Sequence, residues 1–175
     1  MRAVAGARQV PSPNCDERPA GEPVTLLVLH SISLPPGEYG SDAIERLFTN
    51  RLDPQAHAAF ADLRNLRVSA HFLVRRGGEL LQFVPIERRA WHAGVSCWRG
   101  RTRCNDFSVG VELEGSGRHD FTDPQYAQLA QLVRALRARL PLREVAAHSD
   151  LAPGRKSDPG DRFDWRRFFS LLSAR

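Results

Sequence analysis

The chain has 175 residues, of which 42% are hydrophobic and 26% are charged, and its formal net charge is +5. This length and composition predict one soluble globular domain, and no apolar run approaches the roughly 20 residues that a membrane span needs. The arginines are scattered without interleaved aromatic residues, so the positive charge favours some anionic partner and does not support a dedicated nucleic-acid-binding module.

The cysteines and the N-terminal segment indicate the cellular compartment. Cys15, Cys97 and Cys104 cannot all pair, and none lies in a Cys-x-x-Cys motif, so neither a disulfide framework nor a cysteine zinc site is expected. The stretch MRAVAGARQVPSPNCDERPAGEP lacks the apolar core of a secretory signal. We therefore expect a cytoplasmic protein, with residues 1–23 as an irregular lead-in to one domain at 24–175.

The first half of that domain begins with a buried strand. VTLLVLH at 24–30 is a continuous apolar run, typical of a strand covered on both faces. After a Pro- and Gly-rich break, helical spacing predicts a helix within 41–50 and a shorter one from Asp53. AHFLVRRGGELLQFVP at 70–85 predicts a β-hairpin that turns at its two glycines.

The second half alternates strands and helices. NDFSVGVELEG at 105–115 predicts a strand with valines and a leucine on one face. The other face of that strand would carry Gly110, Glu112 and Glu114. The segment 122–141 has the apolar period of a helix, REVAAH at 143–148 predicts a last short strand, and 164–172 a closing helix. These elements predict a mixed α/β fold, with a central mixed sheet flanked by helices.

Two histidines lie at predicted strand ends, where side chains can converge on one pocket. His30 ends the first strand and His148 the last, and Asp158 follows ten residues after His148. Two imidazoles and one carboxylate form the three-ligand set of a catalytic zinc. The spacing matches no helical zinc signature, so hydrogen-bonded structural histidines remain an alternative. Asp150, two residues after His148, competes with Asp158 as the carboxylate ligand.

Lysine and glutamate residues are candidates for the chemistry beside such a metal. Lys156 is the only lysine among 25 basic residues, and a compact ammonium there could stabilise an oxyanion. The alternative is an ordinary surface lysine. Glu112 or Glu114 could act as a general base, although both could instead be solvent-exposed strand carboxylates. Strand alternation does not choose between the two glutamates.

The motifs HSISLPPG, RAWHAG, VELEG and APGRKSDPG occur in the order found in one family, and matching stretches extend from residue 10 to residue 165. On these motifs the chain resembles the AmpD family of zinc amidases, whose fold is shared with peptidoglycan-recognition proteins. The resemblance implies a Zn²⁺-dependent amidase of cell-wall recycling. Its substrate would be the amide bond between the lactyl group of 1,6-anhydro-N-acetylmuramic acid and the L-alanine of the stem peptide.

The same resemblance assigns roles to individual residues. It makes His30, His148 and Asp158 the zinc ligands, Glu112 the general base and Lys156 the residue that stabilises the transition state. The further residues that it suggests near the muropeptide are Arg67, His71, Trp91, His92 and Arg103. Among these, the two arginines would hold peptide carboxylates, and His71 could orient a ligand or water or serve a structural role. A non-catalytic muropeptide-binding module of the same fold is the alternative, and a monomer is favoured.

Overall fold

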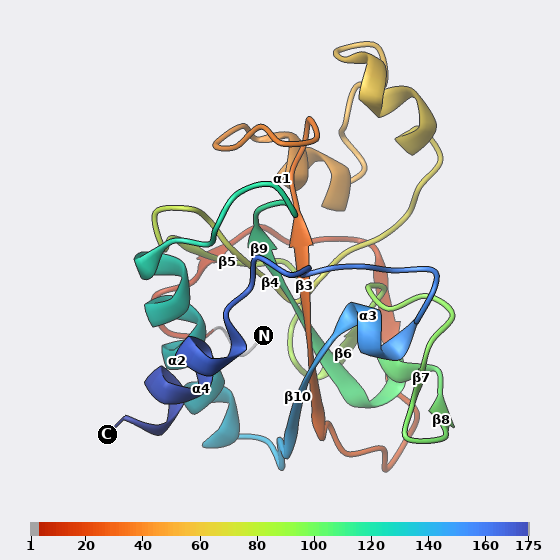
Figure 1. Cartoon of the computed structure of the whole chain (residues 1–175). Helices are drawn as coiled ribbons and strands as arrows, with labels where there is room; N and C mark the ends of the chain where they lie inside the picture. The colour runs from red at the N-terminus through yellow and green to blue at the C-terminus, as the bar shows by residue number, and fades with distance from the viewer. Residues whose placement is uncertain (1–3, 175) are drawn as a thin grey trace.

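The computed structural model describes residues 4–174, and a mixed six-stranded sheet forms its centre (Figure 1). The strand order is β1-β5-β4-β9-β3-β10. The strands of this sheet are β1 (Arg8–Gln9), β3 (Leu26–Ile32), β4 (Phe72–Val74), β5 (Leu80–Gln82), β9 (Ser108–Glu114) and β10 (Glu144–Ala147). Only the β4–β5 hairpin is antiparallel, and the other neighbours pair in parallel. The predicted mixed α/β class is confirmed.

Two small ribbons and several helices surround this sheet. The ribbons pair β2 (Cys15–Glu17) with β6 (Arg88–Ala90), and β7 (Cys97–Trp98) with β8 (Arg101–Thr102). The α-helices are α1 (Ala43–Phe48), α2 (Asp123–Arg137), α3 (His148–Leu151) and α4 (Trp165–Ser173), and the 3₁₀ helices are η1 (Ala58–Leu63) and η2 (Cys104–Phe107). No helix within residues 4–174 is long and apolar enough to cross a membrane.

The first four residues of β3, 26–29, are apolar because both faces of the strand are covered there. Leu27 and Leu29 pack into the core that also contains the apolar faces of α2 and α4 (Figure 1). Leu26 and Val28 point to the opposite face and pack into a second cluster. Since side chains alternate along a strand, His30 lies on the same face as Val28. The sheet therefore separates His30 from the layer of α2 and α4.

The helices follow the predicted order, with one difference in where a helix begins. Thr122 caps α2 through a capping box with Gln125, as the segment's polar start suggests. The short helix expected from Asp53 begins later, because the Asp53 carboxylate accepts a hydrogen bond from the Gln55 backbone N–H and closes a turn. His57 then caps η1 by accepting from the N–H of Ala59.

The N-terminal segment is part of the domain. β1 pairs with β5 at the edge of the main sheet, and β2 pairs with β6. The expectation of an irregular lead-in at 1–23 is therefore corrected for its described part, and residues 1–3 lie outside the described range. Strands of two or three residues are too short to produce a recognisable alternation in the sequence, which explains the difference.

Candidate active site

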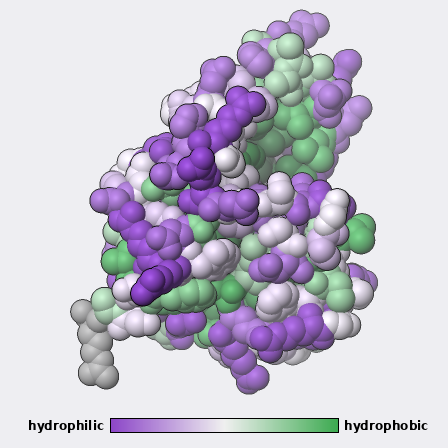
Figure 2. All heavy atoms as spheres, viewed as in Figure 1, coloured by the Kyte–Doolittle hydropathy of each residue, from purple (hydrophilic) through white to green (hydrophobic). Residues whose placement is uncertain are grey.

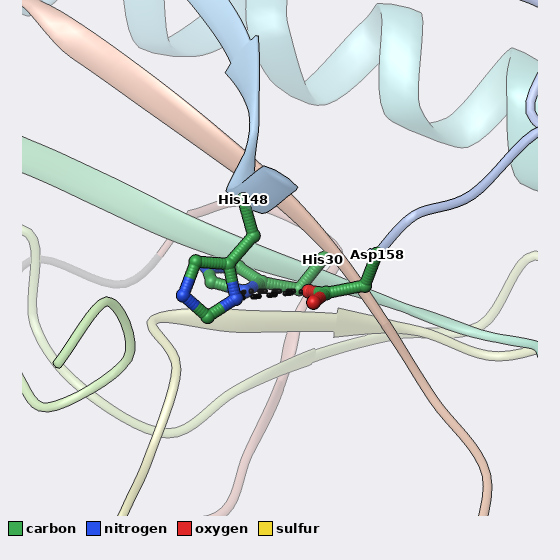
Figure 3. Close-up of side chains that lie close together, drawn as sticks. All are labelled: His30, His148 and Asp158. Atoms are coloured by element: carbon green, nitrogen blue, oxygen red, sulfur yellow. Dashed lines mark hydrogen bonds and ion pairs between the residues drawn. The ribbon is translucent and has the colours of Figure 1, made fainter. Parts of the chain in front are cut away.

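Parallel pairing of β3 and β10 brings the two predicted histidine ligands together. His30 lies on β3, and His148 begins α3 directly after β10. Asp158 lies on the following loop, where its backbone carbonyl accepts a hydrogen bond from the N–H of Ser149 at 3.0 Å. Figure 3 shows the two imidazoles and the carboxylate turned toward one another from these three segments. The ligand atoms of all three side chains lie within 4.8 Å of one another.

The atoms that face one another in this cluster are two ring nitrogens and a carboxylate oxygen, and each could bind a metal ion. The two histidine Nδ1 atoms are 2.9 Å apart and lie 3.1 and 3.0 Å from Oδ2 of Asp158. Nε2 of His148 lies 3.1 Å from the Ala93 carbonyl, which only accepts, so Nε2 carries the proton and Nδ1 keeps its lone pair. Lone pairs that converge with a carboxylate form an arrangement that a bound cation would stabilise. The residues therefore fit a metal ion.

The ionisation of the cluster suits the same purpose. Burial lowers the pKa of His30 to about 4, against the opposing effect of the nearby Asp158 carboxylate, so the imidazole is neutral near pH 7. Burial alone would raise the pKa of Asp158, but the close approach of the His148 and His30 rings outweighs it and holds that pKa well below its usual range. A neutral imidazole and an ionised carboxylate are the forms that bind metals.

The structure also separates Asp158 from its competitor. Asp150 accepts a hydrogen bond from the backbone N–H of Ala147 at 2.9 Å and so closes the start of α3. Its carboxylate is outside the group of ligand atoms that converge on the site. Asp158 is therefore the carboxylate that could complete the metal site.

Glu112 lies beside the cluster because β9 pairs with β3 in a register that sets Glu112 opposite His30. Its Oε2 is buried and has no hydrogen-bond partner among residues 4–174. Burial raises the pKa of Glu112 well above its ordinary value; the negative charge of Asp158 adds to this effect, and Lys156 opposes it. A carboxyl group with a free oxygen and a high proton affinity is suited to general acid–base work.

Glu114, the other candidate base, is occupied elsewhere. Its side chain is buried and accepts a hydrogen bond from Nη1 of Arg75 at 2.9 Å. The backbone N–H groups of Gly40 and Arg76 donate to the same carboxylate at 2.7 and 3.2 Å. This carboxylate therefore holds the β4–β5 turn and the 33–41 loop together, and the expectation of a solvent-exposed strand carboxylate is corrected here.

A cavity of about 490 Å³ contains the candidate catalytic residues. His30, Glu112 and Lys156 all line it, with the exposed Lys156 side chain at its rim. Burial dominates the pKa values of His30 and Glu112, and the positive charge of Lys156 acts on both as a smaller effect that lowers them. One wall of the cavity is apolar and is formed by Leu34, Leu47, Phe48, Leu63, Leu66 and Val68. Figure 2 shows apolar surface gathered in a hollow next to the η1 segment.

The five further residues suggested by the motifs divide into two groups. Arg67, Trp91 and His92 line the cavity. Arg103 does not line it: its side chain is 71% exposed, and its guanidinium pairs with Asp106 at 3.2 Å. The expectation that Arg103 holds a peptide carboxylate has no support from this geometry, because its side chain lies outside the cavity.

His71 is also separated from the cavity. It is fully buried, and its Nδ1 accepts a hydrogen bond from the N–H of Gly110 at 3.0 Å. Its Nε2 lies 3.0 Å from the carbonyl of Arg88. Both ring nitrogens are thus paired with backbone, so the suggestion that His71 contacts substrate is corrected to the structural role that was its alternative.

Arg155 lines the cavity although sequence reasoning did not select it. Its Nη2 donates to the carbonyls of Ala93 and Val95 at 2.8 and 2.5 Å, so it joins the loop before Asp158 to the loop after Trp91. Its position directly before Lys156 was the one available signal. Because the chain contains many arginines, a position beside Lys156 does not by itself single out Arg155.

A mixed sheet that presents two imidazoles, a carboxylate and a neighbouring carboxyl group in one cavity has the layout of a hydrolase whose site could hold a metal ion. Residues 20–161 match the N-acetylmuramoyl-L-alanine amidase family. The chain is 56% identical over 172 residues to the 1,6-anhydro-N-acetylmuramyl-L-alanine amidase AmpD of Escherichia coli K12, covering 97% of this chain and 94% of the relative. The chain belongs to the N-acetylmuramoyl-L-alanine amidase family.

Solved structures agree with this assignment. The fold matches a crystal structure of a selenomethionine derivative of AmpD with a TM-score of 0.95 and 54% identity, over 98% of this chain and 97% of that chain. It also matches AmiD from E. coli in complex with the substrate anhydro-N-acetylmuramic acid-L-Ala-D-γ-Glu-L-Lys, with a TM-score of 0.64 and 28% identity. That match covers 90% of this chain and 65% of AmiD. The family resemblance drawn from the four motifs is confirmed.

Proposed function

We propose that this chain is a zinc-dependent amidase of peptidoglycan recycling. It hydrolyses the amide bond between the lactyl group of 1,6-anhydro-N-acetylmuramic acid and the L-alanine of the stem peptide. The observation that carries the proposal is the convergence of His30, His148 and Asp158 beside the free carboxyl oxygen of Glu112. The chain's 56% identity to an amidase named for that bond supports it.

Zinc is the metal that this donor set favours. Two imidazole nitrogens and one carboxylate oxygen match the ligands of catalytic zinc sites, which keep a fourth position open. When bound, zinc acts as a Lewis acid that polarises a carbonyl group and lowers the pKa of water to about 7. The hydrogen bond from His148 to the Ala93 carbonyl supports the same assignment, because ligand histidines commonly donate their outer N–H to such a partner.

Glu112 carries the proton in the proposed reaction. Its free Oε2 accepts a proton from the attacking water, and its raised pKa strengthens it as an acceptor. As the new carbon–oxygen bond forms and the carbon–nitrogen bond breaks, Glu112 returns that proton to the alanine nitrogen. The products are a lactyl carboxylate on the sugar and a stem peptide with a free amine.

Lys156 stabilises the charge that develops during the same step. Attack on the carbonyl carbon moves negative charge onto the carbonyl oxygen, and an ammonium at the rim of the cavity lowers the energy of that charge. Its place on the lining of the cavity that also contains Glu112 and His30 supports a position close enough to act. No other ammonium side chain is available, since Lys156 is the only lysine in the sequence.

The cavity suits a muropeptide, which is a small molecule with a sugar and a charged peptide. Its apolar wall, which includes Phe48, offers a surface for the face of a sugar ring, and Trp91 adds a second aromatic side chain to the cavity lining. Arg67 and Arg155 add positive charge for peptide carboxylates. The AmiD complex with an anhydro-muramyl tripeptide supports this substrate class.

A cytoplasmic location completes the proposal. The thiols of Cys15, Cys97 and Cys104 are free, as is usual in a reducing compartment. Fractionation of cells that produce the protein, followed by detection with an antibody, tests this location. Recovery with periplasmic markers would contradict it.

Mass spectrometry of reaction products tests the proposed substrate. The protein, supplied with zinc, is incubated with anhydro-muramyl tripeptide and separately with intact cell-wall polymer. The proposal predicts free tripeptide and anhydro-muramic acid from the first reaction and much slower release from the polymer. Binding of the tripeptide without cleavage would instead favour a non-catalytic muropeptide-binding module.

A further inference from the structure

His92 connects a candidate metal ligand to the protein interior. Its Nδ1 lies 3.0 Å from Nε2 of His30, and its Nε2 lies 3.2 Å from the hydroxyl of Ser108. The hydroxyl of Ser108 lies 2.6 Å from the carbonyl oxygen of Cys104. Both ring nitrogens of His92 are therefore engaged, which leaves neither free to bind a substrate atom.

The direction of these hydrogen bonds follows from the last acceptor in the series, which is the backbone carbonyl of Cys104. The Cys104 carbonyl can only accept, so the Ser108 hydroxyl donates to it and accepts from Nε2–H of His92. Nδ1 of a neutral His92 is then bare and accepts from Nε2–H of His30. This leaves Nδ1 of His30 without a proton, and Nδ1 is the atom that faces His148 and Asp158.

The residue after His92 has the same effect on the second histidine ligand. The Ala93 carbonyl accepts from Nε2–H of His148, which leaves the Nδ1 of that ring bare as well. The side-chain oxygen of Asn105 accepts from the backbone N–H groups of both His92 and Ala93, at 3.3 and 2.9 Å. One dipeptide, held by Asn105, thus contacts the outer nitrogen of each ligand.

The sheet leaves space for the His92 ring at one position of β9. A Cβ added to Gly110 would lie 2.4 Å from Cγ of His92, so a side chain there is incompatible with the observed ring position. Gly110 occupies the middle of a strand without a positive φ, and glycine in a strand interior marks a close approach of another group. The absence of a side chain at Gly110 therefore provides the space that the His92 ring occupies.

From these contacts we infer that His92 and Ala93 form a positioning segment that fixes the tautomers and orientations of His30 and His148. His92 is then a positioning residue that acts through His30, in place of the substrate contact suggested by its motif. The inference rests on the zinc site of the proposed function. Partners of this kind typically affect metal affinity about 10–100-fold when they are lost.

Zinc affinity measured by competition with a chelator tests the inference on the full chain. His92→Phe keeps an aromatic ring at this position but removes both hydrogen bonds, and we expect about 10–100-fold weaker zinc binding. His92→Asn offers an amide oxygen near the place of Nδ1 and should restore part of that loss. The Asn105 side chain contacts neither His30 nor His148. Asn105→Ala should nevertheless weaken zinc binding, because it removes the acceptor that holds His92 and Ala93. His57→Phe, which removes an exposed imidazole, should bind zinc like the wild type.

A second readout separates this inference from the proposed function. Imidazole ¹⁵N–¹H spectra of the zinc-free protein should show the wild-type His30 protonated at Nε2, and a mixture of tautomers in His92→Phe. Unchanged zinc affinity and an unchanged His30 tautomer in folded His92→Phe and Asn105→Ala proteins would overturn the inference. A raised KM with normal zinc affinity in His92→Phe would also overturn it, since His92 would then bind substrate. If the wild type bound no zinc, the proposed function would fail, and the His30 tautomers would still decide the inference.

Discussion

Glu112 and Glu114 lie two residues apart on one face of β9, yet their carboxylates have opposite surroundings. The buried Oε2 of Glu112 has no partner among the described residues, whereas Glu114 receives hydrogen bonds from Arg75 and from two backbone N–H groups. The carboxyl group of Glu112 is therefore available for catalysis, whereas the carboxylate of Glu114 has a structural role. This difference separates two glutamates that the strand pattern alone leaves equivalent.

Glu112→Gln should abolish most turnover while it preserves the metal site. The amide keeps the shape of the side chain but cannot accept the proton, so we expect a loss of about 10²–10⁴-fold in kcat. Zinc content, measured by elemental analysis, should equal that of the wild type, because Glu112 is not one of the converging ligand residues. A variant with near-normal turnover would show that another group acts as the base.

Glu114→Gln should act on stability instead. Removing one partner of a buried ion pair leaves an uncompensated charge, and such changes cost about 3–5 kcal/mol. Arg75 retains its ion pair with Glu45 at 2.8 Å, so we expect a loss near the lower end of that range. Urea unfolding measures the loss, and kcat of the remaining folded protein should change little. A large loss of kcat without a loss of stability would exchange the roles of the two glutamates.

Lys156→Ala should lower turnover by roughly 10²–10³-fold, the usual effect of losing one oxyanion stabiliser. Because this interaction forms mainly in the transition state, zinc content and KM should stay close to those of the wild type. Lys156→Arg should recover only part of the activity, since a planar guanidinium differs in shape and reach. Steady-state kinetics on both variants provides the measurement, and a fully active Lys156→Arg would show that positive charge alone suffices.

His71 should make the zinc-free protein less stable in acid. Burial, together with the charge of Arg18, lowers the pKa of His71 to about 3, against an ordinary value of 6.5. Between about pH 6.5 and pH 3, His71 therefore binds a proton in the unfolded chain but not in the folded protein. As the pH falls through this range, the free energy of unfolding decreases by about 1.4 kcal/mol per pH unit. Between pH 7 and pH 5, the wild type should lose about 2 kcal/mol more than His71→Asn.

Unfolding free energies in urea at the two pH values measure this difference. The amide oxygen of His71→Asn can still accept from the N–H of Gly110, so the variant removes the titrating group with limited damage. His57→Asn, which changes an exposed histidine, should retain the full acid sensitivity of the wild type. Equal losses in the wild type and in His71→Asn would contradict the prediction.

Local pattern predicts the elements that position the site. The continuous apolar run before His30 indicates a buried strand, and the alternation around Glu112 predicts which face that glutamate occupies. Both features depend on neighbours along the chain, so the sequence contains them directly. The family motifs add the identity of the residues that converge with His30.

Contacts between distant segments account for what the sequence does not predict. Glu114 differs from Glu112 because Arg75, 39 residues earlier, reaches it, and no local pattern records that pairing. Arg155 depends in the same way on carbonyls about 60 residues away. The role of His92 requires the register of β9 against its neighbours, since only then does Gly110 leave room for the ring.

Removal and return of zinc, followed by assay of anhydro-muramyl tripeptide cleavage, tests the central claim most directly. Protein treated with a chelator and dialysed should lose activity, and about one equivalent of Zn²⁺ per chain should restore it. His30→Ala should neither retain zinc nor recover activity, because it removes one of the three ligands. Full cleavage by the zinc-free wild type, or by zinc-free His30→Ala, would contradict the account.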